Sequence, residues 1–235
     1  MFGTLPDMTS VPVQPVRDVP RRDRDARARL AALRVERTPV VLARDRALAL
    51  TGPLAATLPS VQRGSVVAVG GAVGSGATTA VLEIAAAATA AGEWAAMVDG
   101  TGTLGGLAAA DSGVDLARFA VIRDVPQDRW ATVVAALLDG VSVVIAELPR
   151  TVRVGDARRL VARARERSAV LVTIAPDARA WPVEAAVRVH AHGGLWLGLG
   201  AGDGVLEPRV AVIDVEARGQ SGHGQSGHGQ FELAG

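Results

Sequence analysis

The chain has 235 residues, of which 49% are apolar and 21% charged, and this composition supports a sizeable core and excludes a wholly disordered protein. The formal net charge of +1 excludes a strongly basic nucleic-acid-binding protein, so any such role depends on a local patch. The chain contains no lysine, asparagine, tyrosine or cysteine, which excludes a lysine Schiff base, a phosphate-binding lysine, a thiol nucleophile, a disulfide and a cysteine-based zinc site.

Two N-terminal segments precede the main domain. Residues 1–20 carry four prolines and little apolar periodicity, which predicts a disordered segment rather than a secretory signal. Residues 21–37, RRDRDARARLAALRVER, predict an exposed helix whose narrow apolar stripe includes Leu30 and Leu33. We interpret this helix either as a solvated element or as a docking helix for a partner or a neighbouring protomer.

Residues 38–218 predict a single α/β domain, because short apolar runs alternate with helical patterns. The expected strands are 39–43, 65–71, 94–100, 119–125, 141–148 and 169–176, and the expected helices are 77–92, 105–113, 127–140 and 154–168. Three further strands follow without helices, at 185–194, 195–202 and 209–218. The pattern therefore predicts a mostly parallel sheet flanked by helices, with a C-terminal antiparallel meander.

Residues 219–235 predict a flexible tail rich in Gly, Ser, Gln and His. The pentapeptide GQSGH occurs twice in tandem, at 219–223 and 224–228. Its two histidines make a poor metal site on a flexible chain, so no metal is expected. The end of the tail, with Phe231 and Leu233, loosely resembles the peptide that binds the bacterial sliding clamp, and the pair is a candidate partner anchor.

A glycine-rich loop, GAVGSGATT at residues 71–79, stands between an apolar strand and a helix, where a phosphate-binding P-loop belongs. Gly71, Gly76 and Thr78 meet the pattern G-x-x-x-x-G-K-[ST], but Ala77 replaces the lysine. The glycines still permit backbone N–H groups to surround an anion, while the charge on the β- and γ-phosphates is lost. A dinucleotide fingerprint is a weaker interpretation, since Gly74 and Gly76 fit but Thr79 replaces the third glycine, and a purely structural turn is the other.

Five segments resemble the RecA recombinase core in order and spacing over roughly residues 54–218. They are LPSVQRGSVVAVGGAVGSGATT, MVDGTGTLGGLAAADSGVDLARFAVI, GVSVVIAELPR, WPVEAAVRVHAHGG and LEPRVAVIDVEARG. The first resembles the strand, P-loop and helix of that family, and the third resembles its Walker B strand. The resemblance implies a RecA-like fold.

The departures from that family argue against catalysis. In the family, a glutamate two residues after the aspartate that ends the second strand activates water; here the aspartate is Asp99 and Thr101 takes the place of the base. Glu147 replaces the Walker B acid, and Ala77 replaces the lysine. Arg63 precedes the loop strand and cannot supply the missing charge from its far end. We therefore expect a pseudo-ATPase with no catalytic residue and no required cofactor, and whether ATP and magnesium still bind stays open.

Two short segments match the DNA-binding loops of the family. The candidate DNA-binding residues are Arg150, Arg153, Arg158, Arg159, Arg179 and Trp181. Arginines beside a tryptophan are suited to phosphate contact and base stacking. The alternative is a solvated helix face and a packed loop, which we favour because the recombinase loops are longer.

A lysine-free, degenerate RecA-like core with an N-terminal helix and a variable tail resembles the ImuA family, including its ImuA-prime branch. This resemblance implies an accessory subunit of damage-induced mutagenesis that works with ImuB, an inactive Y-family polymerase relative, and with a C-family error-prone polymerase. The alternatives are a weak nucleotide- or DNA-dependent ATPase and a regulator that docks on RecA or on the cell-division machinery. The most apolar stretch, residues 78–98, contains two glutamates and is too weak to span a membrane, so we expect a cytoplasmic protein.

Overall fold

The computed structural model describes residues 47–193, 209–218 and 224–233, and gives only the backbone for 209–211, 218 and 224–233. These residues all belong to one compact unit, Leu42–Gly235. The expectations for residues 1–20, for the helix 21–37 with Leu30 and Leu33, and for the strands 39–43 and 195–202 lie outside the described residues. None of the described helices is long and apolar enough to cross a membrane.

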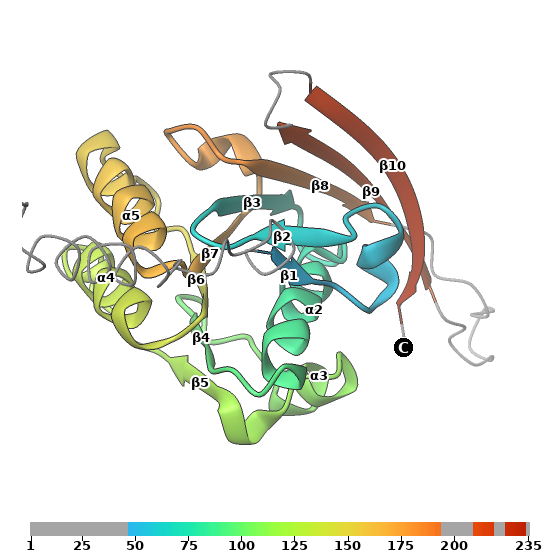
Figure 1. Cartoon of the computed structure of the whole chain (residues 1–235), viewed down its shortest axis with the longest axis horizontal. Coiled ribbons are helices and arrows are strands. Elements are labelled where there is room, and N and C mark those ends of the chain that lie inside the picture. Colours follow the sequence, from blue (N-terminus) through green and yellow to red (C-terminus); the bar gives the residue numbers. More distant parts are fainter. Residues whose placement is uncertain (1–46, 194–208, 219–223, 234–235) are drawn as a thin grey trace, which may run out of the picture. The chain divides into compact units, whose positions relative to one another are not determined.

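A mixed eight-stranded sheet organises the unit, in the order β10-β9-β8-β3-β7-β6-β4-β5 (Figure 1). Six strands of this sheet run parallel to one another: β3 (Val66–Gly71), β4 (Ala95–Val98), β5 (Phe119–Ile122), β6 (Val143–Glu147), β7 (Val170–Ala175) and β8 (Val187–Gly193). The central strands are continuous apolar runs because helices cover both of their faces.

In the described part of the chain, four α-helices pack on the two faces of the sheet. Helix α2 (Ala77–Ala90) and the short α3 (Gly106–Asp111) belong to one apolar core, together with Val67 and Val69 of β3. Helices α4 (Trp130–Gly140) and α5 (Val154–Arg167) belong to the other, together with Val66 and Ala68. The alternation of β3 side chains between the two cores follows from the two-residue period of a strand. This α/β architecture is RecA-like, as the sequence predicted.

A small antiparallel hairpin precedes the glycine loop. Strands β1 (Ala47–Ala49) and β2 (Ser60–Gln62) pair with each other, and the 3₁₀ helix η2 (Pro53–Ala56) connects them. The buried carboxylate of Glu83 on α2 accepts a 2.7 Å hydrogen bond from the backbone N–H of Leu54. This bond fixes the hairpin against α2, and the apolar pattern of the sequence gave no sign of it.

The C-terminal segment corrects one expectation. The antiparallel strand β9 (Arg209–Arg218) was expected, but residues 224–233 were expected to be flexible, whereas they form β10 (Gly224–Leu233), which pairs along its whole length with β9. Candidate anchor residues Phe231 and Leu233 therefore lie within a strand, in register with Ala211 and Arg209. Sheet pairing uses backbone groups, so a sequence rich in Gly, Ser and Gln can form a strand where a neighbouring edge is open.

Candidate functional site

The candidate site lies at the carboxyl ends of the parallel strands, where ligands of such sheets bind. In the sheet register, Glu147 at the end of β6 is level with Ile174 of β7 and Val69 of β3. Asp99 follows directly after β4, the other neighbour of β6. The fold thus brings the predicted acidic positions next to each other, and β7 separates them from the strand that carries the glycine loop.

The glycine loop contains two glycines in left-handed backbone conformation. Gly74 and Gly76 have φ angles of 77° and 95°, which lie in the left-handed region that only glycine adopts freely. Helix α2 begins directly after Gly76, and the backbone N–H of Ala80 is bonded to the Gly76 carbonyl. The sequence interpretation of a strand, a loop and a helix N-terminus is therefore confirmed in geometry.

The interior of this loop is occupied by its own serine. The hydroxyl of the buried Ser75 accepts a 3.3 Å hydrogen bond from the backbone N–H of Ala77. A Cβ atom added to Gly71 would lie 2.1 Å from the Ser75 Oγ, so the first glycine is needed to make room for the serine. Ala77 itself is buried, whereas Thr78 is exposed and Thr79 half-buried. The loop places no cationic side chain of its own where nucleotide phosphates would need one.

Asp99 is fully buried and is held by a set of donors. Its carboxylate forms an ion pair with the Arg123 guanidinium at 2.9 Å and accepts backbone N–H bonds of 3.2 Å from Thr103 and Leu104. Burial acts to raise the pKa of Asp99, but the bonds from Arg123, Leu104 and Gly102 outweigh it and leave the pKa below its ordinary value. Asp99 is thus an ionised structural anchor of the loop that follows β4.

Glu147 and Thr101 bond to each other. The Thr101 backbone N–H donates to Glu147 Oε2 at 2.8 Å, and the Thr101 hydroxyl donates to Glu147 Oε1 at 3.1 Å. Both oxygens of the candidate Walker B acid are therefore engaged by the residue that replaces the catalytic base. Thr101 has no group that can accept a proton from water at neutral pH, so this pair has no general base.

The missing lysine is not replaced from the loop strand. Arg63 precedes β3 and forms an ion pair of 2.5 Å with Glu93, beyond the C-terminal end of α2. This position is at the opposite end of β3 from the glycine loop, as the sequence implied. Arg179, by contrast, lines a cavity of about 510 Å³ together with Gly71 and Ala72 of the loop.

Comparison with known proteins places the chain in a family. The model of the MT3502 N-terminal domain matches residues 56–183, more than half of the chain. The chain belongs to the MT3502 N-terminal domain family. The uncharacterized protein Rv3395c of Mycobacterium tuberculosis is 40% identical over 116 residues, which are 49% of this chain and 56% of that protein. The alignment thus spans little more than half the length of this relative.

The region shared with the MT3502 N-terminal domain contains the glycine loop and both acidic positions, and it also contains the candidate DNA-binding residues. The structure places the candidate DNA-binding residues in two separate regions. Arg150 and Arg153 are exposed in the loop between β6 and α5, where Arg153 borders a cavity of about 420 Å³, and Arg158 and Arg159 are exposed on α5 itself. Arg179 belongs instead to the short helix η4 (Ala178–Ala180), beside the glycine loop. Only Arg159 of these five has an ion pair among the described residues, a 3.6 Å contact with Asp156.

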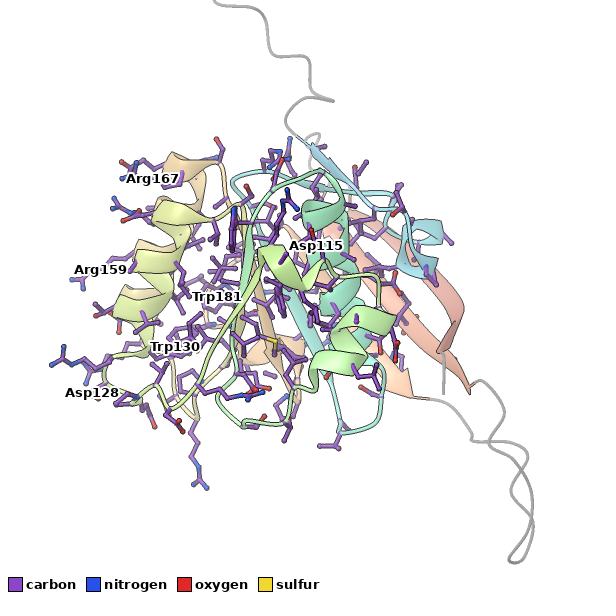
Figure 2. All side chains as sticks on the ribbon, turned by 90° about the horizontal axis from the view of Figure 1, so that it is seen from below. Asp115, Asp128, Trp130, Arg159, Arg167 and Trp181 are labelled. Atoms are coloured by element: carbon purple, nitrogen blue, oxygen red, sulfur yellow. The ribbon has the colours of Figure 1, made fainter. Side chains whose placement is uncertain are left out.

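Trp181 does not fit a DNA-stacking role. Its side chain is 1% exposed and packs in the core formed by α4, α5 and the sheet, whereas Arg159 and Arg167 project from the outer side of α5 (Figure 2). Base stacking requires an accessible aromatic face, so the burial of Trp181 contradicts its candidate DNA contact and agrees with the packed loop that the sequence analysis favoured. The physical reason is local, because Gly70 lacks a Cβ atom and η4 packs directly against β3 there, which carries Trp181 into the core.

Sequence reasoning missed two residues that organise the site. Arg123 follows β5 and holds Asp99 through its Nε, while its other nitrogen donates to the Leu104 carbonyl at 2.7 Å. Trp130 opens α4 and donates its indole N–H to the Glu147 carbonyl at 2.8 Å. Parallel pairing of β4 with β5 places the residues after both strands side by side. A prediction of that pairing from the sequence would therefore have pointed to Arg123 as a neighbour of Asp99.

Proposed function

We propose that this protein is a non-catalytic, RecA-like accessory subunit of damage-induced error-prone DNA synthesis, acting through protein–protein contacts. The MT3502 family assignment is compatible with this role, and the resemblance of the RecA-like core to ImuA supports it. The implied partners are an ImuB-like inactive Y-family polymerase relative and a C-family error-prone polymerase. The core would then serve as a scaffold that kept its fold after nucleotide hydrolysis was lost.

The mutual bonding of Thr101 and Glu147 is the observation that carries the proposal. In a hydrolase, the acid at the end of β6 must be available to a magnesium-bound water, and a second carboxylate must accept a proton. Here Thr101 donates to both oxygens of Glu147, and Ala77 places no charge in the loop. Loss at two separate positions favours a retired active site over a single tolerated substitution.

A hydrolysis assay tests the non-catalytic part of the proposal. We expect the purified chain to release phosphate from ATP at the background rate, with or without single-stranded DNA. The matched control is the Thr78→Ala variant, because Thr78 is the one exposed hydroxyl that retains the P-loop pattern. A rate well above background that disappears in Thr78→Ala would overturn the proposal.

A deletion strain tests the cellular role. We expect the frequency of mutations induced by DNA damage to fall in the deletion and to return when the wild-type gene is restored. Restoration by Thr78→Ala as well would agree with a scaffold, because the scaffold does not use the loop hydroxyl. An undiminished mutation frequency in the deletion would count against the mutagenesis role.

Purification of the tagged protein from damaged cells identifies the partners. We expect polymerase subunits to co-purify; recovery of RecA or of division proteins would instead favour a docking regulator. Recovery of the sliding clamp would indicate that the tail binds it, although Phe231 and Leu233 belong to β10 and this segment would have to leave β9 to bind as an extended peptide.

An electrophoretic mobility shift assay tests the weak DNA contact. Loss of a DNA mobility shift in an Arg150→Ala, Arg153→Ala double variant would assign that contact to the N-terminal end of α5.

Weak nucleotide binding is the second candidate function, and one observation favours it. Arg179 reaches the cavity that Gly71 and Ala72 line, so an arginine from η4 stands near the loop that lacks a lysine. Equilibrium binding of a labelled ATP analogue with magnesium is the test. Binding that weakens in Arg179→Ala, but not in Arg158→Ala on α5, would support this function, whereas no binding at millimolar nucleotide would exclude it.

A further inference from the structure

Helices α4 and α5 lie against each other on one face of the sheet, and a groove follows the outer side of their contact (Figure 2). Two cavities of about 420 and 460 Å³ form this groove, and Ala131 of α4 and Asp156 of α5 border both of them. The first cavity reaches Arg153 before α5, and the second reaches Glu166 in its last turn. Asp156 and Glu166 are about 15 Å apart along the helix axis, so the groove follows most of α5.

The floor of the α4–α5 groove is apolar and consists mainly of small side chains. Ala131 and Ala135 are four residues apart on α4 and face the groove together, while Leu160 of α5 is buried between the helices. Ala162 of α5 also lines the groove and is exposed. Short side chains on both helices therefore leave room for apolar side chains of another molecule.

The rim along α5 carries an excess of positive charge. Residues 150–167 contain seven arginines and two acidic residues, a net charge of +5, whereas the whole chain has a net charge of only +1. Arg153 and Arg159 line the groove and are exposed, and Arg159 projects from the outer side of α5 (Figure 2). Arg163 is engaged by Asp139 and Glu166, so among the described residues of the groove Arg153 and Arg159 are the cations best placed to pair with a partner.

We propose that the α4–α5 groove binds an acidic amphipathic helix of a partner protein. The apolar face of that helix packs on Ala131, Ala135 and Leu160, and its carboxylates pair with Arg153 and Arg159 on the rim. The proposal rests on the proposed scaffold function, for which it names the surface and the chemistry of the partner.

The chemistry of the groove favours such a helix over nucleic acid. Asp128, Asp156 and Glu166 line the groove, and a nucleic acid carries a phosphate on every nucleotide, whereas a helix can direct its carboxylates to the arginines alone. Trp130 lines the first cavity, but it is 5% exposed and its indole N–H is bonded to the backbone of β6, so it offers no face for base stacking. The chain's own residues 21–37 contain seven arginines and three acidic residues, so their charge has the same sign as the rim.

Peptide binding to the full chain, measured by fluorescence anisotropy, tests the proposal. The first probe is a synthetic 14-residue helix, the length of α5, with leucines three and four residues apart on one face and glutamates and alanines elsewhere. The second probe replaces each glutamate by lysine, and the third is a labelled single-stranded oligonucleotide. We expect the wild type to bind the acidic peptide about tenfold or more tightly than the lysine peptide, with an affinity that falls as salt is added.

Two double variants test whether the acidic peptide binds at the rim. Arg153→Glu, Arg159→Glu reverses the two charges that line the groove, and we expect it to weaken binding by about tenfold. The control Arg158→Glu, Arg165→Glu makes the same change in charge at exposed positions of α5 that do not line the groove, and it should retain most of the affinity.

A second pair of variants tests the floor and serves if the charge variants fail to fold. Ala162→Trp fills the groove without a change in charge and should weaken binding, whereas Ala136→Trp changes an exposed position of α4 that does not line the groove and should not. Absence of binding by the acidic peptide, equal weakening within either pair, or tighter binding of the oligonucleotide than of the acidic peptide would overturn the proposal.

Co-purification from damaged cells separates the groove from the proposed function. Loss of polymerase subunits from Arg153→Glu, Arg159→Glu but not from Arg158→Glu, Arg165→Glu would support both. Equal recovery of these subunits by both double variants would overturn the groove as the docking site and leave the scaffold function intact. A wild type that binds the acidic peptide in the groove but recovers no polymerase subunit would support the groove and contradict the mutagenesis role.

Discussion

Among the residues that the structure describes, two carboxylates are buried, and their surroundings differ. Asp99 at the end of β4 receives bonds from the Arg123 guanidinium and from backbone N–H groups of the following loop. Glu83 in the middle of α2 has one donor among the described residues, the Leu54 N–H. The pKa of Asp99 lies below its ordinary value, whereas burial raises the pKa of Glu83 more than the bond from Leu54 lowers it.

The contrast shows that the number and charge of the donors, not burial, decide which form of a carboxyl is stable. The carboxylate of Asp99 is a stabilising anchor because the fold supplies a guanidinium and several amides. The carboxylate of Glu83 costs free energy at neutral pH because one amide does not replace its hydration. Within the candidate site, the hydrogen-bond donors around Asp99 therefore stabilise the loop after β4, which agrees with a structural role for this loop.

Asp99→Asn is expected to have the largest effect. The amide presents an NH₂ group to donors that need an acceptor, and it leaves Arg123 without its counter-charge. We expect the free energy of unfolding at pH 7 to fall by about 2 kcal/mol, measured by urea denaturation. The control is Asp115→Asn, whose ion pair with Arg118 is exposed to solvent and should contribute nothing measurable.

The difference in stability between the wild type and Asp99→Asn is expected to depend on pH. Because the pKa of Asp99 is lowered in the folded state, its stabilisation is present above the unfolded pKa near 3.8 and is lost as the pH falls through the still lower folded pKa. The wild type and Asp99→Asn should therefore begin to converge in stability as the pH falls below about 3.8, and should meet only below the folded pKa of Asp99. Curves that stay parallel into strong acid would mean that Asp99 acts through packing rather than charge.

Most of the sheet was predictable from the sequence, because β3, β6 and β7 are continuous apolar runs and buried parallel strands require them. Strand β10 was not, since its residues carry no apolar alternation and its formation depends on the free edge of β9. Its sequence resembles a linker, and only the register of the partner strand distinguishes it from one.

The candidate site was predictable as a set of positions but not as a set of contacts. Motif spacing located Ala77, Thr101 and Glu147, which the fold places at the carboxyl ends of the parallel strands. Spacing could not reveal that Thr101 bonds to Glu147, because this contact joins residues 46 apart through the alignment of β4 and β6. Spacing could not decide between the two interpretations of Trp181 for a similar reason, since its burial depends on how η4 packs on Gly70.

Glu83→Gln is expected to change the free energy of unfolding in the opposite direction from Asp99→Asn. Glutamine keeps an oxygen for the Leu54 N–H and removes a charge that burial disfavours. We expect the variant to be more stable than the wild type at pH 7 by on the order of 1 kcal/mol. The folded pKa of Glu83 is raised, so the wild type regains this stability as the pH falls, and the gain should vanish below the unfolded pKa near 4.5. A destabilised Glu83→Gln at pH 7 would refute the assignment of Glu83 as an under-bonded carboxylate.

Thr101→Ala tests the weaker bonding at the site surface and should have the smallest effect. The change removes the hydroxyl bonds to Glu147 and Thr103, at 3.1 and 2.8 Å, but keeps the backbone N–H bond to Glu147. Because Thr101 is exposed, water replaces part of what is lost, and we expect a decrease of about 0.5–1 kcal/mol in the free energy of unfolding. The control Thr132→Ala removes an exposed threonine from α4, where alanine is the better helix former, and should not destabilise. Equal loss in both variants would show that the contact between Thr101 and Glu147 contributes nothing specific, leaving Asp99 and Arg123 as the anchor of this edge.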